Sequence, residues 1–325
     1  MRYLALAAVL TGCNSFEDPD IVLDLRVIAM SADKPEQIVD VDLANPQQPA
    51  MLLQQLESST VCAVVADPGQ DRSLRYTLTL CSHGGDYRCS TDADTVIGSG
   101  IVTDPETSPA PVRICARIDA NANLLGVLLD TLDGDVLGGL GGVDYLVQLA
   151  VGGADADPAL DQFAAKWLRV APRIPAARQA NQNPTLERLE ASVERADPVP
   201  LDVSVNGRCA VGRPSLTVRA RDSIRLTPVE PDGAREPYLV PTLDGSTRMF
   251  TESLTYQWIA SAGGFSQGST GGPRDITGND QPLFTDWRAP SAADLAGPTD
   301  VTIWMIQRDE RYGVTAYETC IHVEP

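Results

Sequence analysis

Few residues in this chain are of the types and spacing that carry out catalysis. Residues 264–268 read Gly-Phe-Ser-Gln-Gly and match G-x-S-x-G, the turn that presents the nucleophilic serine of α/β-hydrolases. That turn leads into a helix, but no helical pattern follows Ser266, and glycine and serine continue to Gly272. The one histidine downstream, His322, falls on the last predicted strand. We therefore interpret the segment as a loop and predict no enzymatic activity, with a hydrolase centred on Ser266 as the alternative.

A second group of reactive side chains alternates along the last predicted strand. Glu318, Cys320 and His322 share one face, because side chains repeat every two residues in a strand. A cysteine beside a histidine can act as a nucleophile. Cys320 is better explained as a disulfide partner, so no residue is assigned to catalysis.

One stretch carries oxygen-bearing side chains at the spacing of a calcium-binding loop. Asp119, Asn121, Asn123 and Asp130 occupy positions 1, 3, 5 and 12 of an EF-hand-like pattern. Position 6, normally glycine, is Leu124, and position 12 has aspartate instead of the longer glutamate. The alternative is an Asx-rich turn in which Asn123 caps the following helix. We keep calcium at these four residues as a hypothesis and expect no other cofactor.

The first thirteen residues have the layout of an export signal. Arg2 supplies a positive charge, residues 3–10 are apolar, and Leu-Thr-Gly-Cys at residues 10–13 places small residues before Cys13. The apolar run is less than half of the about 20 residues that span a bilayer. The pattern resembles the lipobox of bacterial lipoproteins, which implies cleavage before Cys13 and lipidation of its thiol.

The resemblance to lipoproteins also suggests a location. Residue 14 is asparagine, not the aspartate that tends to retain enterobacterial lipoproteins in the inner membrane. We predict a signal peptide at residues 1–12 and a lipid-anchored tether at 13–19. The mature protein is then expected at the outer membrane, on its periplasmic or cell-surface side.

Six cysteines remain once Cys13 is set aside. An exported chain meets an oxidising compartment, where disulfides form and persist. Four of the six lie in the first half of the chain and two in the second, which favours pairing within each half. No C-x-x-C motif points to zinc or to redox chemistry. The predicted pairs are Cys62 with Cys115, Cys81 with Cys89, and Cys209 with Cys320.

Alternation of apolar and polar residues predicts the elements that position these groups. Strands are predicted in the first half at residues 21–30, 61–65, 74–80, 112–118, 145–151 and 163–170. In this phasing Cys62, Cys81 and Cys115 lie opposite the main apolar face, so the disulfides are expected to link strands across a surface. Leucines at helical spacing within residues 124–140 predict a short helix that covers one end of the sheets.

The second half repeats the alternating pattern after a proline-rich, polar stretch. We predict an all-β fold with two tandem Ig-like antiparallel β-sandwiches and a short helical insert in the first. The N-terminal sandwich covers residues 20–172, a linker covers 173–196, and the C-terminal Ig-like sandwich covers 197–325. Trp258 is expected in the second core, and Trp304 is expected to be exposed.

Several passages resemble known bacterial proteins. Residues 256–265, 287–290 and 301–309 resemble core strands of bacterial Ig-like and PKD-like domains. Residues 20–30, soon after the lipobox, resemble the start of a family of uncharacterised myxobacterial-type outer-membrane lipoproteins. The resemblance implies a fold and a location, and it brings no catalytic residues.

Charge and composition limit the partners. The net charge of −19 would repel a polyanion, so nucleic acid is not a predicted partner. The predicted function is that of a non-enzymatic cell-envelope lipoprotein, a structural or protein-binding module held at the membrane by its acyl chains. The alternative is a glycan- or calcium-dependent, adhesin-like surface protein. The expected partner is an unidentified envelope protein or a surface glycan.

Overall fold

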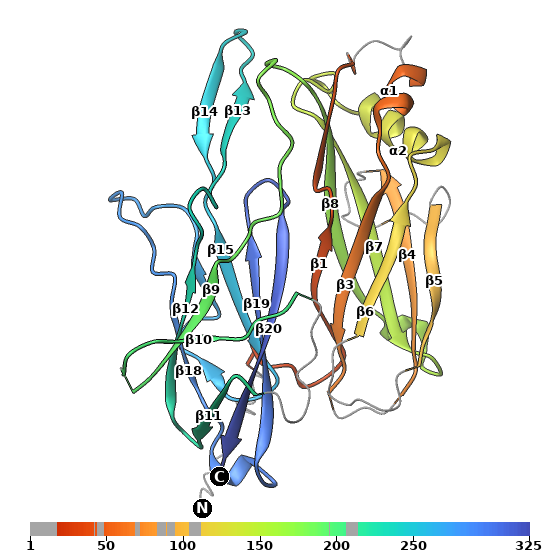
Figure 1. Cartoon of the computed structure of the whole chain (residues 1–325). Coiled ribbons are helices and arrows are strands. Elements are labelled where there is room, and N and C mark those ends of the chain that lie inside the picture. The colour runs from red at the N-terminus through yellow and green to blue at the C-terminus, as the bar shows by residue number, and fades with distance from the viewer. Residues whose placement is uncertain are drawn as a thin grey trace, which may run out of the picture.

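The structure, a computed structural model, describes residues 18–41, 43, 49–68, 72–82, 89, 95–103, 112–194, 196–205 and 214–325. These residues form twenty β-strands and two short α-helices, so the predicted all-β class is confirmed. None of the helices among them is long and apolar enough to cross a bilayer. The strands make two sandwiches that lie side by side (Figure 1).

The first sandwich packs a three-stranded sheet against a five-stranded sheet. The small sheet has the order β1-β3-β6, with β1 (Arg26–Ala32), β3 (Ser59–Ala66) and β6 (Val112–Ile118). The large sheet has the order β2-β8-β7-β4-β5, with β2 (Glu36–Val39), β8 (Gln162–Pro172), β7 (Val143–Gly153), β4 (Leu74–Ser82) and β5 (Thr95–Val102).

The second sandwich packs two five-stranded sheets. One has the order β10-β9-β12-β18-β16, with β10 (Val199–Leu201), β9 (Arg188–Val193), β12 (Ser223–Val229), β18 (Thr285–Arg288) and β16 (Gly264–Phe265). The other has the order β11-β20-β19-β15-β17, with β11 (Leu216–Arg219), β20 (Val314–Glu324), β19 (Thr299–Arg308), β15 (Thr255–Ala260) and β17 (Ser269–Gly271). A separate hairpin, β13 (Pro237–Pro241) and β14 (Thr247–Thr251), extends beyond the sheets (Figure 1).

Both sandwiches have the strand order of an Ig-like Greek key. In the first sandwich β8-β7-β4 correspond to the Ig strands G-F-C, and β3 and β6 correspond to the neighbouring strands B and E of the facing sheet. In the second sandwich β20-β19-β15 correspond to G-F-C, and β12 and β18 correspond to B and E. Trp258 on β15 is fully buried at the place of the Ig strand C tryptophan. The prediction of purely antiparallel sheets is wrong at two places, because β2 pairs parallel to β8 and β11 pairs parallel to β20. The chain changes sheets after β1 in the first sandwich and after β9 and β10 in the second, and it then continues beside the last strand in the same direction.

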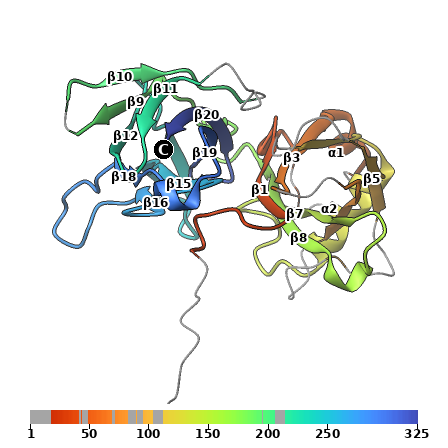
Figure 2. The ribbon, with the colours of Figure 1, turned by 90° about the horizontal axis from the view of Figure 1, so that it is seen from below.

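The alternating residues fill two separate cores, as the period of two predicts. In the first sandwich Leu78, Val147 and Leu149 are fully buried between the sheets. In the second, the core includes the fully buried side chains of Trp258 and Trp287. Figure 2, a view along the strands, shows the two sandwiches as separate bodies in contact along one side.

Two helices cover one end of the first sandwich (Figure 1), as the leucine spacing predicts. They are α1 (Pro49–Gln55) and α2 (Ala122–Asp133). Leu124, Val127 and Leu128 on α2 are buried, and their spacing is that of one helix face. Single turns of 3-10 helix occur at Pro158–Leu160 and Ala292–Asp294.

Two predicted boundaries differ from the structure. Strand β9 lies inside the predicted linker 173–196 and pairs with β12, so the second sandwich begins before residue 197. Charged residues on the outer face of β9 had hidden its alternation. The predicted strand at 21–30 starts late, because residues 20–22 lie against the second sandwich and β1 begins at Arg26. There the amide of Ala260 donates to the carbonyl of Asp20 over 2.9 Å, so the chain contacts the second sandwich before it enters the first.

Candidate functional site

The outer faces of two sheets meet in an apolar contact patch between the sandwiches. Strands β1 and β3 contribute Ile28, Ala29 and Ala66 from the first sandwich. Trp304 of β19 packs against them and is only 2% exposed, and its indole Nε1 donates to Glu318 over 3.0 Å. The complete patch is Val22, Ile28, Ala29, Ala66, Ile259, Trp304, Ile306 and Val314.

The expected exposure of Trp304 is therefore wrong. Strand β19 is buried along both faces from Val301 to Gln307, because one face fills the second core and the other meets the first sandwich. The stretch Val-Thr-Ile-Trp-Met-Ile contains no charge on either face. A continuous uncharged run of this kind indicates a strand covered on both sides, and this signal was present in the sequence.

A buried ion cluster joins the sandwiches beside this patch. Glu36, at the start of β2, is 5% exposed, and its carboxylate accepts hydrogen bonds from the linking segment and from the second sandwich. Its Oε1 accepts from Nη2 of Arg178 at 2.9 Å, and its Oε2 accepts from the amide of Asn181 at 2.9 Å. The same Oε2 accepts from Nη2 of Arg311 at 2.7 Å. The cluster, defined as Glu36, Arg178, Asn181, Glu252 and Arg311, thus connects the first sandwich, the linking segment and the second sandwich.

The turn between β19 and β20 carries Arg311 into the cluster. Asp309 Oδ1 accepts from the amides of Arg311 and Gly313, both at 2.7 Å, which fixes the turn. Asn181 Nδ2 donates to Asp309 Oδ2 at 3.0 Å and so ties the linking segment to it. The Arg311 guanidinium lies 3.2 Å from Glu252 and 4.9 Å from the centre of the Tyr238 ring. This turn therefore acts as the contact point of the second sandwich.

The neighbouring residue of the same turn reaches the large sheet of the first sandwich. The Tyr312 hydroxyl donates to Asp144 Oδ2 at 2.8 Å, and Arg169 Nε donates to Asp144 Oδ1 at 2.6 Å. The buried Lys166 ammonium donates to the carbonyl of Tyr312. Burial lowers the pKa of Lys166 to about 8, against an opposing effect of Asp309. Tyr312 therefore attaches the turn to the first sandwich through both its side-chain hydroxyl and its backbone carbonyl.

Glu252 has the most perturbed carboxyl group of the cluster. Its pKa is raised to about 7, mainly by burial and then by the Asp309 carboxylate, while the Arg311 guanidinium opposes the rise. Glu252 also accepts from the amide of Glu236 at 3.3 Å. The charge of this group therefore changes near neutral pH.

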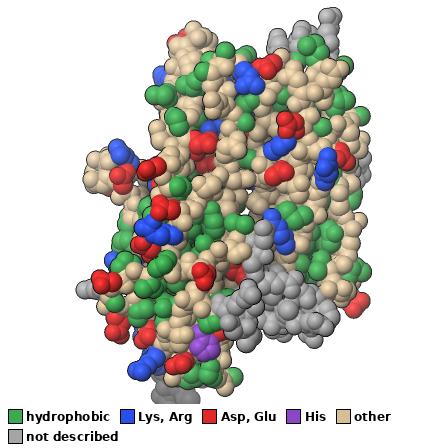
Figure 3. Space-filling model, viewed as in Figure 1, with side chains coloured by type: hydrophobic (Ala, Val, Ile, Leu, Met, Phe, Trp, Pro, Cys, Tyr) green, Lys and Arg blue, Asp and Glu red, His purple; other side chains and the backbone are tan. Residues whose placement is uncertain are grey.

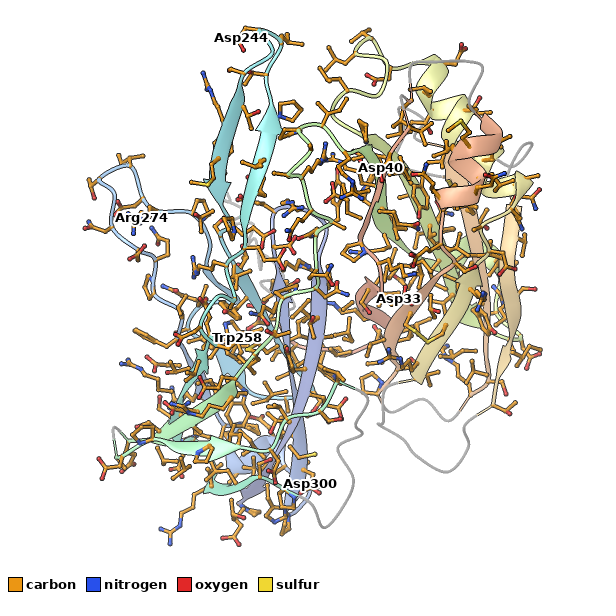
Figure 4. All side chains as sticks on the ribbon, turned by 45° about the horizontal axis from the view of Figure 1, so that its top comes forward. Asp33, Asp40, Asp244, Trp258, Arg274 and Asp300 are labelled. Carbon is orange, nitrogen blue, oxygen red and sulfur yellow. A yellow bond between two sulfur atoms is a disulfide. The ribbon has the colours of Figure 1, made fainter. Side chains whose placement is uncertain are left out.

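A cleft of about 640 Å³ opens above the cluster, between the hairpin β13–β14 and the first sandwich. Asp244 marks the hairpin tip in Figure 4, and Asp40 lies on the first sandwich near the cluster. The walls are largely apolar, whereas the floor carries Glu36, Arg178 and Arg311. Nη1 of Arg178 is buried and has no hydrogen-bond partner among the described residues. The apolar wall residues are Leu137, Leu140, Tyr238, Leu239, Val240, Pro241 and Leu243.

Surface charge does not mark this cleft. On the face shown in Figure 3, acidic and basic side chains are interspersed, with no large area of one sign. Sequence reasoning missed the site because its charged residues are far apart in the chain. The available signal was the pair Arg178 and Asn181 in a segment interpreted as a polar linker.

The calcium pattern does not form an ion-binding loop. Asn121 is the N-cap of α2, and its Oδ1 accepts from the amides of Asn123 and Leu124. Asn123 and Asp130 lie on the helix itself, and Asp119 pairs with Arg117 at 2.8 Å. The expectation that Asn123 caps the helix is wrong by two residues. Helix formation from residue 122 separates the four predicted ligands Asp119, Asn121, Asn123 and Asp130.

The candidate nucleophiles have structural roles. Ser266 accepts from the amide of Asp286 at 3.0 Å in a turn beside β18, with no helix after it. His322 pairs with Asp300 at 2.6 Å on β20, and Glu318 receives the indole of Trp304. Within the described part of the chain no three His, Cys, Asp or Glu residues are grouped to hold a metal ion.

Two predicted disulfides are confirmed. Cys62 and Cys115 are directly opposite each other on β3 and β6, and they link the outer face of the small sheet as the phasing predicts. Cys81 bonds to Cys89. Cys320 is disulfide-bonded. Its predicted partner Cys209 lies outside the described residues, as do His83 and the predicted lipidation site Cys13.

Comparison with known proteins gives no family for this chain. No family model and no curated protein matches it. A red sea bream transglutaminase structure is similar over 94% of this chain and 32% of its own, with a TM-score of 0.26 and 8% identity. The BSP domain of a biofilm-associated protein is similar over 92% and 58%, with a TM-score of 0.24 and 6% identity. The chain spans less than two thirds of either protein, and similarities this distant carry no functional inference.

Proposed function

We propose that this protein is a non-enzymatic, lipid-anchored binding module of the cell envelope that holds a segment of a partner protein in its cleft. The anchor would be the lipidated Cys13, at the outer membrane. The disulfides Cys62–Cys115 and Cys81–Cys89 support an oxidising compartment outside the cytoplasm. The structural roles of Ser266 and His322 support a binding function over a catalytic one.

The position of the cleft suits an anchored binder. The described chain begins beside Ala260, at the end of β15 remote from the hairpin. The hairpin and the helices lie at the opposite end of the molecule (Figure 1). An anchor that precedes Asp18 would therefore leave the cleft facing away from the membrane surface.

The observation that carries the proposal is the buried ion cluster under the cleft. Glu36, Asn181 and Arg311 fix the orientation of the two sandwiches through hydrogen bonds of 2.7 to 2.9 Å. The walls of the cleft belong to different sandwiches, so this contact sets their separation before any ligand arrives. A site that is already formed avoids the entropic cost of ordering its walls on binding.

The lining residues indicate the chemistry of the ligand. Leu137 and Leu243 stand at the rim with exposed fractions of 51% and 81%, and apolar side chains this exposed favour contact with a partner. At the floor, the unpaired Nη1 of Arg178 is a donor without an acceptor. A peptide segment with an apolar side chain next to a carboxylate matches both features.

Photo-cross-linking in intact cells tests the cleft. A photoreactive amino acid at Leu243 or at Leu137 should give the same cross-linked partner protein. A Leu243→Asp change should reduce the cross-link from Leu137 at least tenfold. Ile276 is an exposed apolar residue on a loop outside the cleft, and the same probe there is the matched control. Equal cross-linking from Ile276 would exclude the cleft as the binding site.

Metabolic labelling tests the anchor separately. An alkyne-tagged fatty acid should label the wild-type protein and leave a Cys13→Ser variant unlabelled. The variant should also leave the membrane fraction, because two or more acyl chains are needed for stable anchoring. A labelled Cys13→Ser variant would contradict the lipoprotein assignment without bearing on the cleft.

A further inference from the structure

The hairpin β13–β14 forms a two-stranded sheet of its own. All five residues of β14 are exposed, and its one strand neighbour in the described chain is β13. An exposed strand edge presents unpaired N–H and C=O groups that can pair with another strand. Whether this hairpin can pair with another strand therefore depends on what protects its two edges.

The register shows which backbone groups point outward. The amide of Glu252 donates to the carbonyl of Glu236, and the amide of Thr242 donates to the carbonyl of Ser246, both at 3.0 Å. Hydrogen-bonded pairs alternate with non-hydrogen-bonded pairs in an antiparallel ladder. The outward-pointing groups therefore belong to residues 237, 239 and 241 on β13, and to residues 247, 249 and 251 on β14.

The two edges differ in protection. On β13 the first and last outward positions are Pro237 and Pro241, which have no N–H to donate. On β14 the outward positions are Thr247, Met249 and Thr251, and each offers both a donor and an acceptor. Prolines thus block one edge, and the other edge is open along its full length.

We propose that the β14 edge pairs antiparallel with β14 of a second copy of this chain. The register centred on Met249 places Met249 opposite Met249, Thr247 opposite Thr251 and Arg248 opposite Phe250 of the second copy. Threonine pairs and an arginine over an aromatic ring are favourable cross-strand neighbours, and no like charges face each other. The five-residue sequence Thr-Arg-Met-Phe-Thr is therefore complementary to itself, as a two-fold interface requires.

The two-fold axis sets the shape of the dimer. In an antiparallel strand pair this axis is perpendicular to the sheet, so the second copy is turned upside down. Strand β14 runs along the long axis of the molecule, and the hairpin extends beyond the sheets of the second sandwich, level with the helices of the first (Figure 1). The two bodies then point away from each other, with Asp18 of each copy at opposite ends of the dimer.

This interface is small, and it forms against the electrostatic repulsion between two negatively charged copies. One strand pair buries less than the about 1,200 Å² of a standard stable interface. Each copy also carries a net charge of −19, and this repulsion weakens as salt screens it. We expect a weak dimer whose population rises with both protein concentration and ionic strength.

Sedimentation of the full-length protein in a density-matched detergent tests the edge. Wild type should show a concentration-dependent dimer, and Met249→Pro should abolish it, because this change removes an outward N–H without loss of a hairpin hydrogen bond. Leu239→Pro, the same change at the equivalent position of β13, is the matched control and should leave the dimer intact. A wild-type protein that stays monomeric up to about 1 mM, where association is worth about 4 kcal/mol, would overturn the proposal.

Cysteine cross-linking tests the register. Residues at a hydrogen-bonded position face each other with Cα atoms about 5.5 Å apart, within disulfide range. Met249→Cys alone should therefore give a disulfide-linked dimer. Thr247→Cys and Thr251→Cys should cross-link at least tenfold better when mixed than separately. Efficient cross-linking of Thr247→Cys with itself, or a dimer insensitive to Met249→Pro, would contradict this pairing. None of these results depends on what binds in the cleft.

Discussion

The two sandwiches touch through two neighbouring contacts built on opposite chemistry. The apolar contact patch around Trp304 and Ile28 comes from regular strands and excludes water. The buried ion cluster around Glu36 comes from a turn and a linking segment, and it depends on charged groups placed to within hydrogen-bond distance. Apolar burial is non-directional, whereas a buried ion cluster is favourable only in one arrangement. The apolar patch therefore stabilises the contact between the sandwiches, and the ion cluster selects the relative orientation that forms the cleft.

The largest effect is expected at the patch. Trp304→Ala should lower the free energy of unfolding by about 4 kcal/mol, because it leaves a cavity and removes the indole that donates to Glu318. Urea denaturation followed by circular dichroism measures the loss. Phe250→Ala removes an exposed aromatic ring on the hairpin, and as control it should cost less than about 1 kcal/mol. Equal losses in both variants would show that the patch does not hold the sandwiches together.

The ion cluster should respond in a different way. Glu36→Ala leaves Arg178 and Arg311 without their shared carboxylate, and it should cost about 3 kcal/mol. Joint replacement of Glu36, Arg178 and Arg311 by methionine should recover stability to within about 1 kcal/mol of wild type, because these three charges are removed together. Glu252 then lacks the Arg311 guanidinium that lowers its pKa, so burial keeps it protonated and neutral. Denaturant titration of both variants measures this recovery.

The same pair of variants separates stability from orientation. If the cluster selects the geometry of the cleft, the triple methionine variant should keep its stability and lose the cross-link from Leu243. Asp40→Ala removes one partner of the exposed Arg173 pair, and it serves as the control with a loss below about 1 kcal/mol. A stable triple variant with normal cross-linking would show that the patch alone sets the orientation.

This contrast also explains how far the sequence could predict the molecule. Strands that alternate cleanly, such as the one with Leu78 and Leu80 or the one with Tyr256 and Trp258, are local patterns, and the all-β class follows from them. The contact between Glu36 and Arg311 joins residues 275 positions apart, and no local pattern reports it. The calcium hypothesis failed for a related reason, because Asp119 to Asp130 was interpreted by spacing while the leucines beside it favoured a helix.

The smallest of these effects is a pH dependence inside the ion cluster. Glu252 has a pKa of about 7 in the folded protein, above its ordinary value of 4.5, because it is buried and lies near Asp309. The folded state therefore binds this proton more tightly than the unfolded state. The stabilisation that protonated Glu252 contributes is complete below pH 4.5 and is lost as the pH rises through 7.

Glu252→Gln should remove this dependence. Relative to the variant, wild type should lose on the order of 2 kcal/mol of stability between pH 5 and pH 8, measured by urea denaturation at each pH. Glu187→Gln changes an exposed carboxylate and should leave the profile unchanged. The apolar patch contains no titratable group, so Ile306→Val should lower stability equally at both pH values. Parallel profiles for wild type and Glu252→Gln would mean that Arg311 keeps Glu252 ionised throughout, and that the cluster, like the patch, is insensitive to pH.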